Sequence, residues 1–242
     1  MASGIMINGT MQKVPFLAVS VGPYAALALL PMLAWLAVEY VWDVFEGSFY
    51  KRHLSNPVQS FSIGTWISAL SITSVTLTAV LPSLRNVAIF LFILAILLIL
   101  AFIILLVIWN YVRFWSYPSR VDEVKGVLLL ECVAVQSIVV AGNKLYSHSL
   151  STQASLFFIG LGILFYLAGF VVILASFRDK KAFSFIKNWS NTNAIIHGAV
   201  SITGLAVVSS SIRASDGAAV IRLIALFFCI FKIKKKVLFP VC

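Results

Sequence analysis

The sequence predicts an all-α, polytopic membrane protein with about eight transmembrane helices. Of its 242 residues, 61% are hydrophobic and only 11% are charged, whereas charged residues make up about a quarter of a typical soluble domain. A mean hydropathy of +1.03 excludes a soluble globular domain, and the many large apolar residues exclude a disordered chain. Several stretches approach or exceed the ~20 apolar residues with which a helix crosses a bilayer.

Eight candidate spans follow one another along a single transmembrane domain that covers residues 1–242. The first span is weak and the last is short, whereas the six between them are clear apolar runs. Pro57, Pro82 and Pro118 fall between spans, where proline removes no hydrogen bond from a helix interior. The spans are expected at residues 1–11, 20–42, 60–81, 86–112, 124–142, 154–177, 193–212 and 217–233.

The basic residues predict the orientation of these spans. Thirteen of the 18 Lys and Arg residues fall in one set of alternate loops. Because cytoplasmic loops carry the excess of basic residues, both termini are predicted to be cytoplasmic. The net charge of +10 then follows mostly from topology, so we expect no nucleic-acid partner. Glu39 and Asp43, near Lys51 and Arg52, are expected to be solvated charges in the headgroup zone.

Polar residues are concentrated in every second span. Span 60–81 contains nine Ser and Thr residues, whereas span 86–112 contains none. Polar groups against lipid are costly, so the polar faces of spans 60–81, 124–142 and 193–212 are expected to face other helices or water. The predicted architecture is a set of helical hairpins around a central axis, with odd-numbered spans inside and even-numbered spans outside.

Two interpretations of the hydroxyl groups stay open at this point. Ser and Thr in membrane helices often bond their own backbone or simply allow close packing, and for any single hydroxyl this is the favoured interpretation. Nine in one span favour a wet or tightly packed interior face. Gly64, Ser68 and Ser71 share one helical face, which could equally be a helix–helix contact.

Glu131 and His197 are ionisable residues at similar depth in the membrane. Glu131 lies about seven residues into its span and His197 about four to six into its own, which places both roughly 6–11 Å inside the cytoplasmic boundary. An ionisable residue in a membrane is by default a functional-site hypothesis, here a proton-linked or gating pair. The alternative is a buried structural hydrogen bond, with Glu131 protonated because burial disfavours the charged form.

Catalytic and metal-binding sequence patterns are absent. The chain contains no HExxH, GxSxG, P-loop or GxGxxG motif. Cys132, Cys229 and Cys242 do not have the spacing of metal ligands. We therefore expect neither an enzyme nor a bound cofactor or metal ion.

Three segments resemble the tellurite-resistance/dicarboxylate transporter family, which includes the plant slow-type anion channels. Residues 1–5, MASGI, are similar to the VMATGI element of the family's first helix. Residues 56–62, NPVQSFS, resemble the HPVR-F-S sequence that begins its third helix. Residues 189–206, WSNTNAIIHGAVSITGLA, resemble the seventh helix of bacterial members. The three segments occur in the family's order and extend over most of the chain.

The resemblance implies ten helices, arranged as five hairpins around a pore that odd-numbered helices line. It also implies permeation by small anions, frequent assembly into homotrimers and residence in a bacterial plasma membrane. Gln59 stands where the family has an arginine, which weakens any anion attraction at that point. After the eighth helix the sequence departs from the family pattern, so we expect a truncated chain that lacks the ninth helix and its gate phenylalanine.

The sequence therefore predicts an integral membrane channel or carrier for small anions: inorganic anions, dicarboxylates or tellurite-type oxyanions. Hydroxyl and amide donors can replace part of an anion's hydration shell without binding it too tightly to leave. The residues expected to line such a path between odd-numbered spans are Thr65, Ser68, Gln136 and Ser201. The residues expected to tune it or to carry protons are Glu131 and His197.

Two other functions stay open from the sequence. A proton-coupled exporter would use Glu131 and His197 as its relay, and a pH gradient would drive its flux. A truncated remnant or helper subunit would transport nothing by itself. For each of these functions, the protein is expected to lie in a lipid bilayer.

Overall fold

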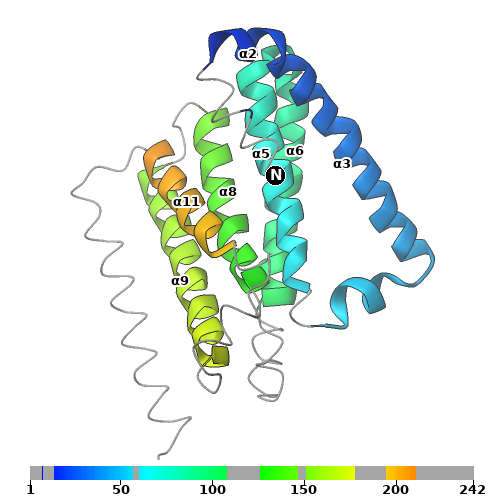
Figure 1. The fold of residues 1–242 in the computed structure, drawn as a ribbon, viewed down its shortest axis with the longest axis vertical. Helices are drawn as coiled ribbons and strands as arrows, with labels where there is room; N and C mark the ends of the chain where they lie inside the picture. Colours follow the sequence, from blue (N-terminus) through cyan, green and yellow to red (C-terminus); the bar gives the residue numbers. More distant parts are fainter. Residues whose placement is uncertain are drawn as a thin grey trace, which may run out of the picture.

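The structure, a computed structural model, is helical throughout the residues that it describes, which are Ile7, 14–56, 60–107, 126–146, 151–177 and 195–210. These residues form seven α-helices and no strand, as the predicted all-α class requires (Figure 1). The α-helices are α2 (Pro15–Ser20), α3 (Gly22–Phe45), α5 (Gly64–Val80), α6 (Arg85–Ala101), α8 (Leu130–Leu145), α9 (Thr152–Phe177) and α11 (Ile195–Ser209). Short 3-10 or π-helical turns are η2 (Tyr50–Leu54), η3 (Phe61–Ile63), η4 (Pro82–Leu84), η5 (Phe102–Val107) and η7 (Gly126–Leu129).

Five helical segments are apolar and long enough to cross a membrane. They correspond to the second to sixth predicted spans, with ends that differ by a few residues or more. α11 is a shorter apolar helix of 15 residues within the seventh predicted span. The first and eighth predicted spans, 1–11 and 217–233, lie outside the described residues except for Ile7. The five segments are Gly22–Phe45, Phe61–Val80, Pro82–Ile104, Gly126–Leu145 and Thr152–Ile173.

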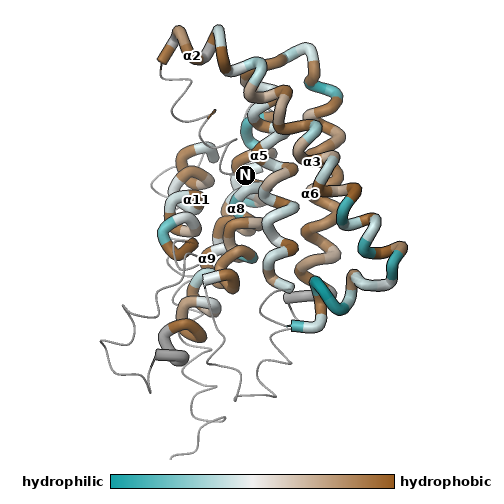
Figure 2. Tube along the Cα trace, turned by 45° about the vertical axis from the view of Figure 1, so that its right-hand side comes forward, coloured by the Kyte–Doolittle hydropathy of each residue, from teal (hydrophilic) through white to brown (hydrophobic). Residues whose placement is uncertain are grey.

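Burial follows polarity in four of these segments. The exception is Gly22–Phe45, which has the same mean hydropathy of 1.7 as Gly126–Leu145 but is largely exposed. Over an 18-residue stretch of each segment, 94% of the residues are buried in Gly126–Leu145 and 61% in Phe61–Val80, but 28% or less in the other three. α8 therefore lies at the centre, between α5 and α6 on one side and α9 and α11 on the other (Figure 1). Figure 2 shows brown along most of α6 and paler colours along α5. Among α5, α6, α8 and α9, the polar helices lie inside and the apolar helices outside, as predicted. The prediction that the polar face of span 193–212 also lies inside is not met by α11, because His197 and Ser201 are exposed among the described residues.

Glycines allow the central helices to approach one another closely. A Cβ atom at Gly64 would lie 3.0 Å from the carbonyl oxygen of Leu130 and 3.2 Å from Cζ of Phe102. A Cβ atom at Gly162 of α9 would overlap the Gln136 carboxamide of α8. In lipid, van der Waals packing between small residues is a main source of helix association. The α5–α8 and α8–α9 contacts therefore depend on these two positions.

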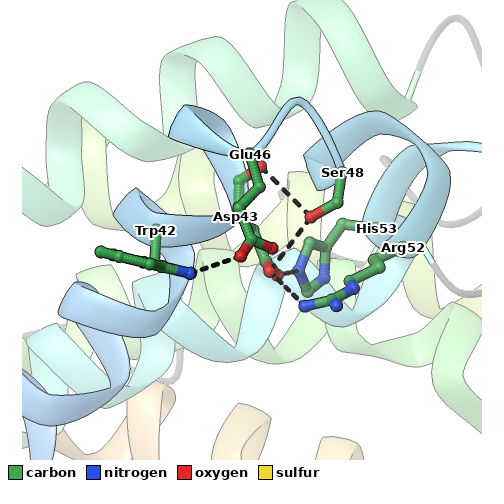
Figure 3. Close-up of polar contacts among 6 residues, drawn as sticks. All are labelled: Trp42, Asp43, Glu46, Ser48, Arg52 and His53. Carbon is green, nitrogen blue, oxygen red and sulfur yellow. Dashed lines mark hydrogen bonds and ion pairs between the residues drawn. The ribbon is translucent and has the colours of Figure 1, made fainter.

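A buried carboxylate ties the end of α3 to the segment that follows it. Asp43 is only 7% exposed. It accepts hydrogen bonds from His53 Nε2 at 2.8 Å and from Ser48 Oγ at 3.2 Å, and it pairs with the Arg52 guanidinium (Figure 3). Gly47, with a φ of +69°, reverses the chain in a backbone conformation that glycine adopts without strain. We call Asp43, Ser48, Arg52 and His53 the Asp43 cluster.

The burial of Asp43 corrects the expectation that it is a solvated charge. Glu39 is exposed, as expected, and accepts a hydrogen bond from Trp35 Nε1 at 2.8 Å. Asp43 is buried because the turn at Gly47 brings back donors that lie five to ten positions further along the chain. A carboxylate can be buried only where such donors compensate for the lost water.

Replacing Gly64 with alanine should destabilise the bundle. The new methyl group would meet the backbone oxygen of Leu130, which cannot rotate away, so α5 and α8 would have to separate. Overpacking of this kind costs about 1–3 kcal/mol, and thermal unfolding in detergent should show a lower midpoint. Gly204→Ala is the matched control, because a Cβ atom at Gly204 meets nothing within 4 Å. Equal shifts in the two variants would contradict a close α5–α8 contact.

Replacing Asp43 with asparagine should loosen the segment after α3. Asparagine keeps one acceptor oxygen, but it loses the negative charge and has an NH2 group in place of the other oxygen. At least one partly buried donor then lacks its acceptor, which costs about 1–3 kcal/mol, so local opening should become about fivefold more frequent or more. Limited trypsin cleavage after Lys51 and Arg52 measures this opening. The control is Glu46→Gln, because Glu46 is exposed and, among the described residues, its side chain accepts a hydrogen bond only from Trp42 Nε1, at 2.7 Å. Cleavage rates that match in both variants would rule out a structural role for the cluster.

Candidate functional site

Polar side chains gather in the centre of the bundle, on the two helices that are most buried. The members on α5 and α8 and the one on α9 are each no more than 1% exposed. Such a concentration is unusual in a membrane bundle, because each polar group needs a partner away from water. We call this set the polar seam: Ser68, Ser71, Ser74, Thr76, Glu131, Gln136, Ser137, Asn143 and Ser155.

Most hydroxyl groups of the polar seam donate to their own helix. Ser68 Oγ donates to the carbonyl oxygen of Gly64 at 3.2 Å, and Ser74 Oγ donates to that of Ser71 at 3.0 Å. Ser137 Oγ makes the same kind of bond to Ala134, at 2.7 Å. These bonds satisfy the hydroxyl protons within the helix. They support the first of the two interpretations at these positions, in which hydroxyls bond their own backbone.

Ser71 differs from its neighbours on α5. It is fully buried, and its Oγ has no hydrogen-bond partner among the described residues. A buried hydroxyl in this state has both a proton to donate and lone pairs to offer. Sequence reasoning placed Ser71 on a shared face with Gly64 and Ser68 but not among the lining residues. Nothing in the sequence distinguishes it from the other hydroxyls, because the difference lies in side-chain orientation.

Gln136 and Asn143 point from α8 towards α9. Gln136 Nε2 donates to the carbonyl oxygen of Ile159 at 3.2 Å. Asn143 Nδ2 donates to the carbonyl oxygen of Val139 at 3.0 Å and lies 3.3 Å from Ser155 Oγ. The carboxamide oxygens Oε1 of Gln136 and Oδ1 of Asn143 have no hydrogen-bond partner among the described residues. Two acceptors in the α8–α9 contact are therefore open to a water molecule or another donor.

The four predicted lining residues lie in different surroundings. Ser68 and Gln136 are fully buried. Thr65 is half-buried, and its Oγ1 donates to the carbonyl oxygen of Ser62 at 2.6 Å. Ser201 is exposed, and its Oγ donates to the carbonyl oxygen of His197 at 2.9 Å. No hydrogen bond within the described ranges joins one of these four side chains to another.

Glu131 and His197 also lie in different environments. Glu131 is fully buried in the first turn of α8, whereas His197 is exposed on α11. The structure shows neither a hydrogen bond nor an ion pair between these two described residues. α11 does contact α8 elsewhere, where Cys132 Sγ and Thr203 Oγ1 lie 3.7 Å apart. A direct proton transfer between Glu131 and His197 therefore has no bond to follow in this conformation.

Nearly the whole chain matches one known family. The family model described as voltage-dependent anion channel (SLAC1) matches residues 1–235. Neither the curated proteins nor the solved structures gave a match to the chain. The family match confirms the resemblance carried by residues 1–5, 56–62 and 189–206, and its members are membrane anion channels and transporters rather than enzymes. This chain belongs to the SLAC1 family of voltage-dependent anion channels.

Proposed function

We propose that the chain conducts small anions across a membrane, as a channel or a carrier, along the polar seam and past the exposed face of α11. The observation that carries this proposal is the Ser71 hydroxyl, buried in the centre of an apolar bundle without a described partner. An anion needs hydrogen-bond donors to replace its water shell. Ser71 offers such a donor without first breaking a hydrogen bond to any described residue.

Two of the predicted lining residues can join Ser71 in this role. The Gln136 amide has two N–H groups, and within the described part of the chain one of them is engaged, by the carbonyl oxygen of Ile159. The Ser68 hydroxyl makes a long bond of 3.2 Å to Gly64, which is weak enough to exchange. Ser201 and Thr65 would contribute only after rotation away from their own backbone acceptors. We propose Ser71 as the first donor, with Ser68 one turn away on the same helix. Gln136 would act as a further donor on the α9 side of α8.

We propose that Glu131 is neutral while anions pass. Moving a carboxylate charge from water into a low-dielectric interior costs several kcal/mol, and a negative charge there would repel anions. Glu131 then shapes the path as a hydrogen-bonding group, and the exposed His197 tunes anion access at the end of α11. The alternative, a proton-coupled exporter, would require a relay between residues that differ completely in burial.

The remaining properties are also proposals. Both termini are cytoplasmic if the excess of basic residues in alternate loops marks the cytoplasmic side. The helices form hairpins of one transmembrane domain around a shared axis. The family resemblance suggests a homotrimer in a bacterial plasma membrane, and the transported class includes inorganic anions, dicarboxylates and oxyanions.

Ser71→Ala should lower anion flux. Loss of a hydrogen bond to a charged group costs about 1.5–3 kcal/mol, which corresponds to about a 10–100-fold slower passage. Flux of chloride, nitrate and malate into liposomes containing the purified protein measures this change. The matched control is Ser74→Ala on the same helix, because the Ser74 hydroxyl is equally buried but donates to its own helix. If Ser71→Ala and Ser74→Ala change the flux equally, at equal thermal stability, Ser71 is not a donor on the path.

Glu131→Gln separates the anion path from proton coupling. If Glu131 acts as a neutral group, the amide replaces it with flux changed by no more than about twofold, and His197→Asn acts only on anion access. The measurement is anion flux in liposomes with and without an imposed pH gradient. Flux that requires the gradient and disappears in both variants would instead establish the exporter. No flux from a well-folded wild-type protein would favour the remnant or helper subunit.

A further inference from the structure

An apolar groove runs between α3 and the central helices. It has a volume of about 450 Å³ and is lined by fourteen residues of α3, η3, α5, α6 and the turn after α3. Figure 1 shows α3 diverging from α5 and α6 towards its C-terminal end. This volume falls in the range of ligand pockets, about 300–1,000 Å³. The side chains used below are Leu30, Ala34, Ala37, Tyr40, Val41 and Trp66.

The lining of the groove favours a hydrocarbon occupant. Twelve of the fourteen lining side chains are aliphatic or phenylalanine, and only Tyr40 and Trp66 carry a polar atom. A cavity without polar partners does not hold ordered water. All lining residues but Phe49 belong to segments that can cross the membrane, so the available solvent is the hydrocarbon of the bilayer.

The length of the groove matches one half of a bilayer. Its α3 side extends from Leu30 to Val41, which is about 16 Å of helix. The hydrocarbon core of a membrane is about 30 Å thick, so one leaflet is about half of that. Twelve residues of a helix form a cylinder about 10 Å wide that occupies on the order of 1,400 Å³, so a helix from a second copy would lie over the groove rather than within it. A single extended acyl chain of a lipid fits within the groove.

One end of the groove has the chemistry of the headgroup region. The Tyr40 ring stacks on His53 with centroids 4.4 Å apart and meets Trp66 edge-on at 4.9 Å. Tyr and Trp concentrate at membrane–water interfaces. Lys51 lies in η2, two residues after the lining residue Phe49, where it is exposed and makes no ion pair with any described residue. Arg52 beside it is held by the Asp43 cluster, so the position of this basic end is fixed.

We propose that the groove between α3, α5 and α6 is a phospholipid site, with one acyl chain in the groove and an anionic headgroup at Lys51. Ala34 and Ala37 keep the α3 side open, because their small side chains leave the volume that the chain occupies. The site is separate from the polar seam, so it does not depend on anion conduction. The bound acyl chain would keep α3 apart from α5 and α6.

Trp66 allows a direct test, because it lines the groove. In a variant that keeps only Trp66, with the other five tryptophans changed to phenylalanine, lipids with brominated acyl chains should quench its fluorescence. A second reporter variant that keeps only Trp35, which is 69% exposed, reads lipid at the outer surface. No quenching of Trp66 in a folded protein would overturn the proposal.

Filling the groove should displace the chain. Ala37→Phe, or Ala34→Phe if the first variant does not fold, should remove most of the Trp66 quenching and leave the Trp35 quenching unchanged. Val38→Phe is the matched control, because Val38 is 64% exposed, is adjacent in sequence and does not line the groove. Equal quenching of Trp66 in Ala37→Phe and Val38→Phe would show that only surface lipid is sensed.

The preference for an anionic headgroup is tested by comparing two classes of phospholipid. Brominated phosphatidylglycerol should quench Trp66 at about fivefold lower mole fraction than brominated phosphatidylcholine, since one lysine near an anionic lipid is worth about 1 kcal/mol. Lys51→Gln should remove this preference, whereas Lys144→Gln at the end of α8 should keep it. A preference that survives Lys51→Gln, or cross-linking of a second copy into the groove, would overturn the assignment.

Discussion

The arrangement of the bundle depends on one constraint: a polar group inside a membrane must find its partner within the protein. α5 and α8 carry the polar residues, and they are the two helices that the others cover. α6 and α9 carry few polar residues, mostly near their ends, and face outward. Hydrophobic attraction cannot order helices in this way within lipid, because hydrocarbon solvates an apolar surface as well as a neighbouring helix does. Polarity and small contact residues therefore set the order of the layers.

The same constraint limits how the polar seam can handle an anion. Hydroxyls that donate to their own helix are satisfied, and they present oxygen lone pairs rather than protons to the interior. The carboxamides of Gln136 and Asn143 donate through their N–H groups to α9 and, for Asn143, also to α8, and their oxygens likewise remain as acceptors. A seam built mostly of acceptors passes anions only where some donors remain available. This makes a buried hydroxyl such as Ser71 more informative than the number of hydroxyls in the helix.

The sequence predicted the layers better than it predicted the site. The contrast between nine Ser and Thr residues in one span and none in the next indicated which helices lie inside, and the family motifs were sufficient to identify the family. Side-chain direction was not accessible, because it depends on packing against partners far away in the chain. Gln136 turns to α9 because Gly162 leaves room for it, and Asp43 is buried because a turn at Gly47 returns its donors.

Gln136 and Gly162 occupy one shared volume: the carboxamide fills the space where a methyl group at the glycine would lie. A side chain at position 162 would therefore require Gln136 to adopt another rotamer. In that rotamer Gln136 would give up the hydrogen bond that its amide donates to Ile159. The glycine thus sets the direction of the carboxamide as well as the distance between α8 and α9.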